Sequence, residues 1–546
     1  MPPLSFRTPI SHVLVLAGVC FLAITPFFWM GIPSGHDFEF HLFSWMEVLG
    51  QWKQGIVYPR WAALAHWGYG EARFLFYPPA SWTLGAALGA ILPWKLVAGA
   101  YCWITLTLAG ISMHRLAREW LPAPDALFAA AFYAMNPYHL VIVYWRSAYA
   151  ELLAAALLPL LLLSLLRLKE PGVRPVLCLS LTLAAAWLTN APAAVMIHYS
   201  AAALAVLIAA QERSWRLLSR AGLAVILGIG LASFYLLPAI FEERWINIGE
   251  VLASGVRPQD NFLFTTGADV DHNRFNLLVS YVALAEIGVV AGAIWRSRPS
   301  RLNKETLWLL LSAWGGLTTL LMFSVSNSLW QYLPKFRYVQ LPFRWLLCLN
   351  AALALLLAMA ARRWLTRALA VAALLAVLMM VGYRIQAPWW DHASDIQEMK
   401  EAMLDGTGNE GIDEYVLAGA DPYELNKDLP RITGPSGKAV PVEMIDWGPI
   451  EKHFIVRTVR PENLTLRLFN YPAWQVRVND RAVKTGTTEV TGQMVIPVAA
   501  GRNEVRIRFG RTLDRTIGDI VSMISLILLL AAWIATRPRN ATNATA

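Results

Sequence analysis

Long apolar runs recur along this chain and are separated by short polar turns. A run of about 17 to 25 residues is long enough to cross roughly 30 Å of hydrocarbon as a helix. On that basis the pattern predicts about twelve membrane spans. They are residues 10–33, 97–116, 124–144, 148–167, 174–190, 192–211, 219–240, 276–296, 305–325, 345–361, 366–384 and 516–536. The apolar run 79–93 is short and contains small residues throughout, so we expect a helix lying in the outer interface.

The pattern changes near Lys438, where short runs of alternating apolar and polar residues begin. Pro, Gly, Asn and Asp separate these runs, which is typical of strands joined by turns. The stretch predicts a small antiparallel β-sandwich with hairpin turns at Asn479–Asp480 and at Ala499–Asn503. We therefore expect a membrane domain at 1–384 with an outer first loop at 34–96, a β-rich domain at 385–515, and a last helix with its tail at 516–546.

Composition agrees with a membrane protein, because 57% of the residues are hydrophobic, only 15% are charged, and 24 are tryptophan. If 79–93 does not cross, the basic residues of the short loops all fall on one side, which the positive-inside rule makes cytoplasmic. These residues are Arg7, Arg115, Arg118, Arg167, Lys169, Arg174, Arg213, Arg216, Arg220, Arg296, Arg298, Arg301, Lys304, Arg362, Arg363, Arg367, Arg537 and Arg539. Both termini are then cytoplasmic, and 34–96 and 385–515 lie outside.

The net charge of +9 belongs mostly to these loops. It indicates topology and excludes a nucleic-acid binder, which gathers Lys and Arg on one soluble face. All four cysteines fall inside predicted spans, so neither a disulfide nor a zinc site is expected. These features suit a multi-pass protein of a bacterial inner membrane, with membrane lipids as its surroundings.

Several short motifs occur in a characteristic order along the chain. They are Gly35–His41 (GHDFEFH), Tyr58–Trp61 (YPRW), Gly68–Gly70 (GYG), Phe76–Pro79 (FYPP), Tyr144–Glu151 (YWRSAYAE), Phe234–Pro238 (FYLLP), Val339–Trp345 (VQLPFRW), Asp413–Tyr415 (DEY) and Tyr471–Trp474 (YPAW). With this order the chain resembles the GT-C glycosyltransferases. More closely, it looks like the bacterial YfhO-like group, also described as 6-pyruvoyl-tetrahydropterin synthase-related membrane proteins. The pterin label is not carried into function, because the chain has no soluble metal-binding fold.

The resemblance implies a GT-C-like helical bundle that transfers a sugar from a polyprenyl-phosphate donor to an outer-face glycan, lipid or envelope polymer, with inversion. Such a reaction needs a carboxylate that takes a proton from the acceptor hydroxyl. It also needs cations that neutralise the departing lipid phosphate. Two alternatives remain. One is a transporter or flippase of lipid-linked glycans, and the other is a non-catalytic protein of envelope-polymer assembly.

Asp37 is the expected base, because it follows the first span at the outer membrane edge. Glu39 is its nearest rival, since residues i and i+2 share a face if the loop is extended. His36 and His41 are expected to bind substrate, or to complete a metal site with the acids. No cofactor is expected, and a divalent metal is left open. Alternatively, Asp37 has no catalytic role and only anchors the loop at the membrane interface.

The expected phosphate contacts are arginines on the outer side. Arg146 and Glu151 start the fourth span, and Arg337 and Arg344 bracket the outer loop 326–344. Arg offers a forked, permanently charged set of donors that suits phosphate. Arg60 and Tyr77 in the first loop complete the expected substrate contacts. An Arg146–Glu151 ion pair, or contact of these arginines with bulk lipid headgroups, would explain the same residues without catalysis.

Overall fold

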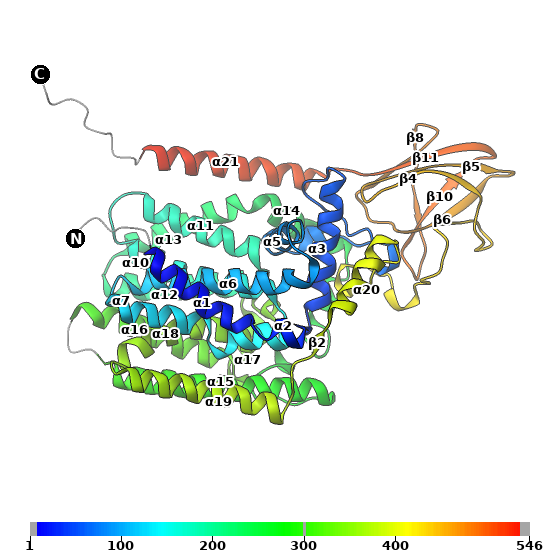
Figure 1. The fold of residues 1–546 in the computed structure, drawn as a ribbon. Coiled ribbons are helices and arrows are strands. Elements are labelled where there is room, and N and C mark those ends of the chain that lie inside the picture. Colours follow the sequence, from blue (N-terminus) through cyan, green and yellow to red (C-terminus); the bar gives the residue numbers. More distant parts are fainter. Residues whose placement is uncertain (1–7, 299–301, 536–546) are drawn as a thin grey trace, which may run out of the picture.

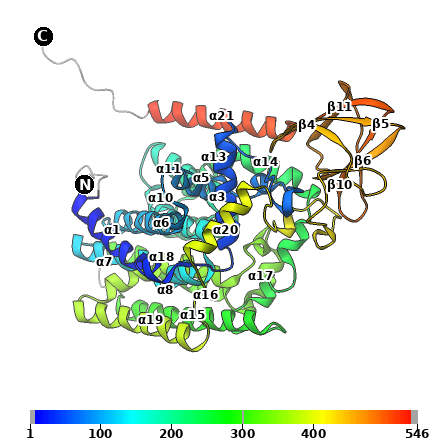
Figure 2. The same cartoon turned by 45° about the vertical axis from the view of Figure 1, so that its right-hand side comes forward.

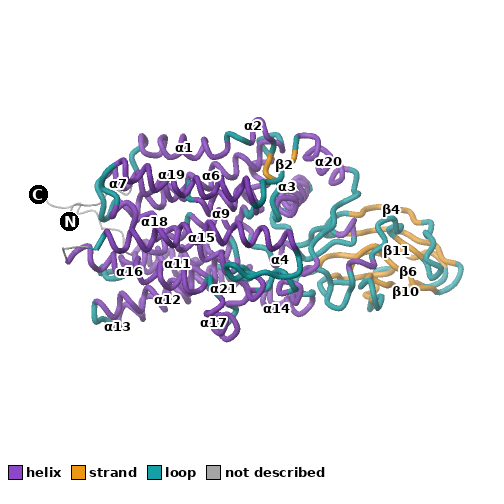
Figure 3. Tube along the Cα trace, turned by 90° about the horizontal axis from the view of Figure 1, so that it is seen from below, coloured by secondary structure: helices purple, strands orange, loops and turns teal. Residues whose placement is uncertain are grey.

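The computed structural model describes residues 8–298 and 302–535. Its long helices run roughly side by side in one bundle, and the C-terminal strands form a separate layer beyond one end (Figure 1). From below, the helical and strand-rich parts meet at a belt of loops (Figure 3). We call that end of the bundle the strand-facing end and the opposite one the far end. Of the basic residues used for topology, Arg7, Arg301, Arg537 and Arg539 lie outside the described residues.

The bundle is built from apolar helices of membrane-spanning length and from shorter pieces of broken helices. They are α1 (Ile10–Ile24), α2 (Phe27–Met30), α6 (Trp94–Ala117), α7 (Ala123–Ala134), α8 (Pro137–Val141), α9 (Tyr149–Ala155), α10 (Leu157–Arg167), α11 (Arg174–Thr189), α12 (Ala191–Gln211), α13 (Trp215–Leu231), α14 (Ser233–Glu242), α15 (Val270–Arg296), α16 (Leu302–Leu321), α17 (Asn327–Tyr332), α18 (Leu346–Ala360), α19 (Trp364–Arg384) and α21 (Leu513–Ala535).

Among the described residues, 9 helical segments are long and apolar enough to cross a membrane, or up to 11 if each of two bent pairs counts as one span. The bent pairs lie at 215–245, with an angle of 75°, and at 305–332, with an angle of 91°. The helix Arg174–Thr189 is apolar but shorter. The chain is a multi-pass helical membrane protein, and the count of about twelve spans stays a prediction.

One broken span matters for the site. Helix α7 ends before Pro137, which has no N–H to continue the helical hydrogen bonds. The Asn136 side chain accepts a 2.9 Å hydrogen bond from the backbone N–H of His139 and so starts α8. The span then ends in one π-helical turn, Ile142–Arg146, followed by Ser147 with φ of 50°. Turns of this kind often occur at functional sites, because they redirect side chains.

Short helices cover the strand-facing end. They are α3 (Phe38–Lys53), α4 (Arg73–Phe76), α5 (Pro79–Gly89) and α20 (Ala393–Leu404). Helix α20 packs against α3 (Figure 2). Helix α5 has 11 residues and rises only about 17 Å at ~1.5 Å per residue, which is too short to cross a bilayer. It is not among the candidate spans, in line with the expected interfacial helix, while the side of the membrane stays a prediction.

The C-terminal strands form two antiparallel sheets. The strands are β3 (Ile432–Thr433), β4 (Val442–Trp447), β5 (Glu451–Thr458), β6 (Glu462–Phe469), β7 (Trp474–Val478), β8 (Arg481–Ala482), β9 (Gly486–Thr487), β10 (Gln493–Val498) and β11 (Gly501–Phe509). One sheet has the order β3-β6-β10-β9, and the other has the order β4-β5-β11-β7-β8. Alternate residues of both sheets, such as Leu466 and Val505, are buried in one shared core, which confirms a C-terminal β-sheet domain.

The two predicted turns have different outcomes. Asn479 and Asp480 have φ of 51° and 62° and join the paired strands β7 and β8, so the predicted hairpin is confirmed. The prediction of a hairpin at Ala499–Asn503 is wrong, because β10 and β11 belong to different sheets. Asn503 donates a 2.7 Å hydrogen bond to the carbonyl oxygen of Ala499, which stabilises a corner between the sheets.

A strand pairing and a buried ion pair are two of the contacts that fasten the C-terminal part to the bundle. Strand β1 (Ile32–Pro33) pairs with β2 (Trp390–Asp391). At the end of α14, the buried Glu242 carboxylate receives two hydrogen bonds from Arg515, of 2.7 and 2.8 Å, and one of 2.6 Å from the Tyr471 hydroxyl. We call Glu242, Arg515 and Tyr471 the Glu242 latch. It joins α14, α21 and the β-sheet domain at one point.

Candidate active site

The chain around Asp37 is held against the end of the broken span. The Gly35 N–H donates to the Ser147 hydroxyl at 3.0 Å, and the Asp37 N–H donates to the carbonyl oxygen of Arg146 at 2.9 Å. A Cβ on Gly35 would lie only 2.3 Å from the carbonyl oxygen of Trp145, so only glycine allows this approach. Asp37 is therefore fixed beside the π-helical turn, at the N-terminal cap of α3.

Several charged or polar side chains surround the partly exposed Asp37 carboxylate. Arg146, Arg344, Tyr77, His41 and Glu414 all lie within range of an electrostatic interaction with it. Apart from His41, which belongs to the helix that Asp37 caps, those residues lie far from Asp37 in the sequence. The Asp37 side chain makes no hydrogen bond or ion pair with any residue that the structure describes. Its carboxylate therefore remains available to a ligand.

A buried ion cluster of unequal charge lies next to Asp37. Glu151 pairs with Arg146 Nη1 at 2.6 Å and with Arg344 Nε at 3.2 Å. Its other carboxylate oxygen accepts a 2.6 Å hydrogen bond from the Tyr138 hydroxyl. All four side chains are buried. We call Arg146, Arg344 and Glu151 the two-arginine cluster. Because one carboxylate faces two guanidinium groups, the three residues alone hold one positive charge in excess, and the Asp37 carboxylate lies within electrostatic range of both arginines.

Neighbouring groups fix both guanidinium groups. Arg344 also donates from Nη1 to the carbonyl oxygen of Val339 at 2.8 Å and to Gln340 Oε1 at 3.0 Å. Arg146 lies over the Phe343 ring, 5.5 Å from its centroid, where the ring face attracts a cation. Such preorganised cations need little rearrangement to receive an anion.

Tyr77, one of the expected substrate contacts, lies near Asp37. Its ring contacts Phe40, with centroids 4.6 Å apart, and His41, with centroids 5.9 Å apart. Burial, followed by the nearby Asp37 carboxylate, raises the pKa of Tyr77 well above its usual value. The phenol thus stays protonated and offers a hydrogen-bond donor beside Asp37.

Glu39 does not share a face with Asp37, so the expectation from an extended loop is wrong. The chain is already helical from Phe38 onward, and Glu39 lies on the exposed side of the first turn of α3. Its carboxylate interacts with Asp391 and Glu410. Partial burial and these two carboxylates raise the pKa of Glu39. Asp37 and Glu39 therefore interact with different groups.

His36 and His41 have different surroundings. His36 packs against Phe275 and Trp389, with ring centroids 4.7 and 5.6 Å away. His41 is buried among aromatic rings, and burial lowers its pKa to about 4, so that it is neutral at pH 7. Among residues 8–298 and 302–535, no group of three or more His, Cys, Asp or Glu side chains is arranged to hold a metal ion.

Two predicted arginines lie elsewhere. Arg60 is stacked on Tyr58, 4.4 Å from the ring centroid, and its charged neighbours are those of the Glu242 latch region. Arg337 is exposed and contacts Tyr338, 5.5 Å from that ring centroid. The structure therefore brings Arg146, Arg344, Glu151, Tyr77 and His41 to Asp37, but it brings neither Arg60 nor Arg337.

Sequence reasoning assigned no role to Glu414, although Asp413–Tyr415 is one of the motifs. The structure holds this segment against the first loop. The Ile412 N–H donates to the Glu71 carboxylate at 2.9 Å, and the Tyr415 ring is stacked on Phe76, with centroids 6.0 Å apart. Burial, and then the carboxylates of Glu71, Asp413 and Asp37, raise the pKa of Glu414 to about 7. The C-terminal part thus brings a second acid to the Asp37 site.

Comparison with known proteins gives a family match and similarity to solved structures. A model described as the 6-pyruvoyl-tetrahydropterin synthase related domain of membrane proteins matches residues 74–388. No curated protein matches the chain. Among solved structures, archaeal oligosaccharyltransferase AglB from Archaeoglobus fulgidus, in complex with an inhibitory peptide and a dolichol-phosphate, is similar at 14% identity with a TM-score of 0.41. The similarity covers 73% of this chain and 54% of AglB, so the chain spans about half of that structure's length.

Proposed function

The chain belongs to the family of 6-pyruvoyl-tetrahydropterin synthase-related membrane proteins, and from that premise we propose that it is a membrane glycosyltransferase. It takes a sugar from a polyprenyl-phosphate donor and transfers it, with inversion, to a glycan, lipid or envelope polymer on the outer side of the membrane. The observation that carries this proposal is the two-arginine cluster, with its excess positive charge, directly beside the available carboxylate of Asp37.

In the proposed reaction, Asp37 removes the proton from the acceptor hydroxyl. The acceptor oxygen then bonds to the anomeric carbon of the sugar, and the bond from that carbon to the phosphate oxygen breaks. One displacement of this kind inverts the anomeric centre. Arg146 and Arg344 neutralise the phosphate as its charge increases, because they are already fixed and largely removed from water.

Glu414 has a supporting part in this proposal. With a pKa of about 7, it is partly protonated near neutral pH. Its protonated form offers a hydrogen bond to the acceptor and does not repel the Asp37 carboxylate. Tyr77 supplies a second donor beside Asp37. Together these groups orient the acceptor before its proton is removed.

The proposed topology follows from charge. The described basic residues of the short loops lie at the far end of the bundle, and the Asp37 site lies at the strand-facing end. The positive-inside rule then makes the far end cytoplasmic. The site and the β-sheet domain face the periplasm of a bacterial inner membrane. The proposed division of the chain remains 1–384, 385–515 and 516–546.

The test uses the purified full-length chain with a panel of polyprenyl-phosphate sugars, and envelope glycans and lipids as the acceptor source. The readout is release of free polyprenyl phosphate, and the Asp37→Asn variant is the matched control. We expect at least one donor to be consumed by the wild type well above this control. If wild type and control release equal amounts with every donor in the panel, the transferase proposal is wrong.

A further inference from the structure

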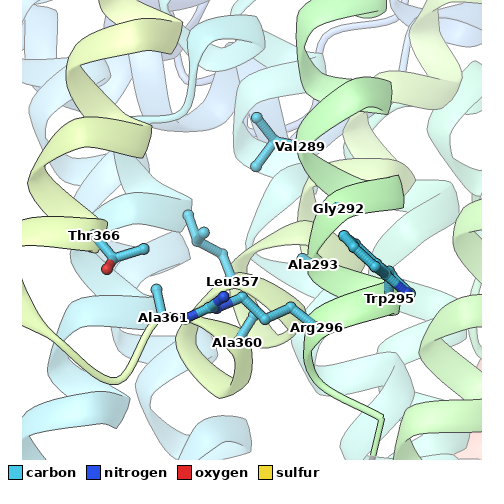
Figure 4. A pocket seen from close by; sticks show the side chains of 9 residues that line it. All are labelled: Val289, Gly292, Ala293, Trp295, Arg296, Leu357, Ala360, Ala361 and Thr366. Atoms are coloured by element: carbon cyan, nitrogen blue, oxygen red, sulfur yellow. The ribbon is translucent and has the colours of Figure 1, made fainter.

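A cavity of about 510 Å³ opens at the far end of the bundle, away from the Asp37 site. It lies between the end of α15, the end of α18 and the start of α19 (Figure 4). We call it the α15–α19 cavity. Its volume falls within the ~300–1,000 Å³ that is usual for small-molecule sites.

The lining of the α15–α19 cavity combines apolar walls with one cation. Val289, Leu357 and Ala361 contribute apolar walls, and Gly292 contributes no side chain. Arg296 reaches from α15 toward Ala361, and Thr366 faces the gap from the first turn of α19 (Figure 4). The lining contains no carboxylate.

Basic side chains gather at this corner. Arg296 forms no ion pair with any residue in the part of the chain that the structure describes. The turn between α18 and α19 carries two more exposed arginines, Arg362 and Arg363. The first turn of α19 has no side-chain cap, so its free N–H groups add to the positive potential. The corner therefore attracts an anion.

We propose that the α15–α19 cavity is a binding site for an anionic phospholipid. One acyl chain fills the apolar cavity, and the headgroup phosphate contacts Arg296 and the Thr366 hydroxyl. A phospholipid fits better than a soluble anion, because both α15 and α19 are candidate membrane spans and the cavity opens between them. Basic pockets between membrane helices on the cytoplasmic side bind anionic lipid headgroups in this way.

The site has a connection to the opposite end of the bundle. Near its start, α15 carries Phe275, which packs against His36 with ring centroids 4.7 Å apart. Helix α19 brings Gly382 close to the Trp145 ring, and the Trp145 indole donates to the carbonyl oxygen of Gln386 at 2.8 Å. Only 17% of the apolar window of α19 is buried in the chain itself. A bound lipid would therefore fix the spacing of two helices that both end at the Asp37 site.

Three variants of the full-length chain test the proposal. Arg296→Gln removes the cation and keeps most of the side chain. Gly292→Leu fills the cavity, and a Cβ at Gly292 has no heavy atom within 4 Å, so the helix tolerates it. Gly288→Leu is the matched control, because Gly288 is equally open but does not line the cavity.

Binding of phosphatidylglycerol and phosphatidylcholine to the detergent-purified proteins is measured by native mass spectrometry. We expect the wild type and Gly288→Leu to prefer phosphatidylglycerol, Arg296→Gln to lose about fivefold of that preference, and Gly292→Leu to retain less of both lipids. An added excess of inorganic phosphate should not displace the lipid.

Three outcomes would overturn the proposal. They are an unchanged lipid preference in Arg296→Gln, equal lipid retention by Gly292→Leu and Gly288→Leu, or full displacement of the lipid by inorganic phosphate. The measurement reads binding alone, so it is independent of the proposed transferase activity.

Discussion

Two of the buried glutamates at the strand-facing end that are paired with arginine, Glu242 and Glu151, differ in charge balance. Glu242 meets one arginine, which covers both of its oxygens, and the Tyr471 hydroxyl adds a further hydrogen bond. Glu151 meets two arginines, and one positive charge remains beside Asp37. A balanced pair joins segments of the chain, whereas an unbalanced one is prepared to receive an anion. The same residue types thus serve stability at one place and binding at the other.

The largest expected effect is the loss of turnover when Asp37, beside the unbalanced pair, is replaced. Asp37→Asn keeps the shape but removes the proton acceptor, so turnover should fall by roughly 10²- to 10⁴-fold. Donor affinity should stay near that of the wild type. Steady-state release of polyprenyl phosphate gives the turnover, and a binding titration gives the affinity.

Glu39→Gln is the matched control for Asp37→Asn, since Glu39 faces Asp391 and Glu410 instead of the two-arginine cluster. Glu39→Gln should lower turnover far less than Asp37→Asn does. Loss of turnover in Glu39→Gln, with turnover kept in Asp37→Asn, would assign the base to Glu39. Full activity in both variants would mean that neither acid of the first loop takes part in the reaction.

The Glu242 latch predicts a loss of stability without a direct effect on chemistry. Glu242→Gln leaves Arg515 buried without its counter-charge, which costs about 3–5 kcal/mol. Thermal unfolding in detergent should shift to clearly lower temperature. Glu243→Gln is the control, because its partner Lys335 is exposed and such a pair contributes only ~0–1 kcal/mol. Equal shifts in the two variants would mean that the latch has no special role.

Replacing Arg344 or Arg337 compares an arginine of the two-arginine cluster with an exposed surface arginine. Arg344→Ala should raise the donor concentration needed for half-maximal rate by roughly 10- to 100-fold, because hydrogen bonds to charged groups contribute ~1.5–3 kcal/mol. Arg344→Lys should restore only part of this, since lysine lacks the planar fork. Arg337→Ala should have little effect. Equal losses from the two alanine variants would indicate that both arginines merely attract lipid from a distance.

The smallest effect concerns pH. The pKa of Glu414 is raised to about 7 in the folded chain, so the folded state binds more protons than the unfolded state between pH ~4.5 and ~7. The contribution of Glu414 to stability is therefore present at low pH and is lost as pH rises through that window. Glu414→Gln removes this loss, so its melting temperature relative to the wild type should increase with pH. A constant difference from pH 5 to pH 8 would contradict the shifted pKa.

The sequence predicted the parts of the molecule that depend on local pattern. The membrane-length apolar runs, the short helix within 79–93 and the strands after Lys438 all follow from local patterns of apolar and polar residues. The family resemblance is confirmed by the match over 74–388. The hairpin at Asn479–Asp480 was predictable because a two-residue turn has its own residue preferences. The corner between the two sheets at Ala499–Asn503 was not predictable, because a turn between sheets uses the same residue types as a turn within a hairpin.

The site was predictable in its residue types and less so in its geometry. Asp37, Arg146 and Arg344 come together only because a π-helical turn, Ser147 and Gly35 allow close packing, and no periodicity signals that contact. Arg337 and Arg344 are seven residues apart, yet only one reaches the cluster. Glu414 arrives from the C-terminal part, and a single sequence cannot pair it with Asp37.

The most direct test of the account is an experimental structure of the full-length chain with a non-reacting phosphonate analogue of a polyprenyl-phosphate sugar. We predict that the phosphonate group lies within hydrogen-bond distance of Arg344 and Arg146, with the anomeric carbon facing Asp37. A phosphonate seated at Arg60 or Arg337, or an anomeric carbon remote from Asp37, would contradict the proposal that the two-arginine cluster and Asp37 form one active site.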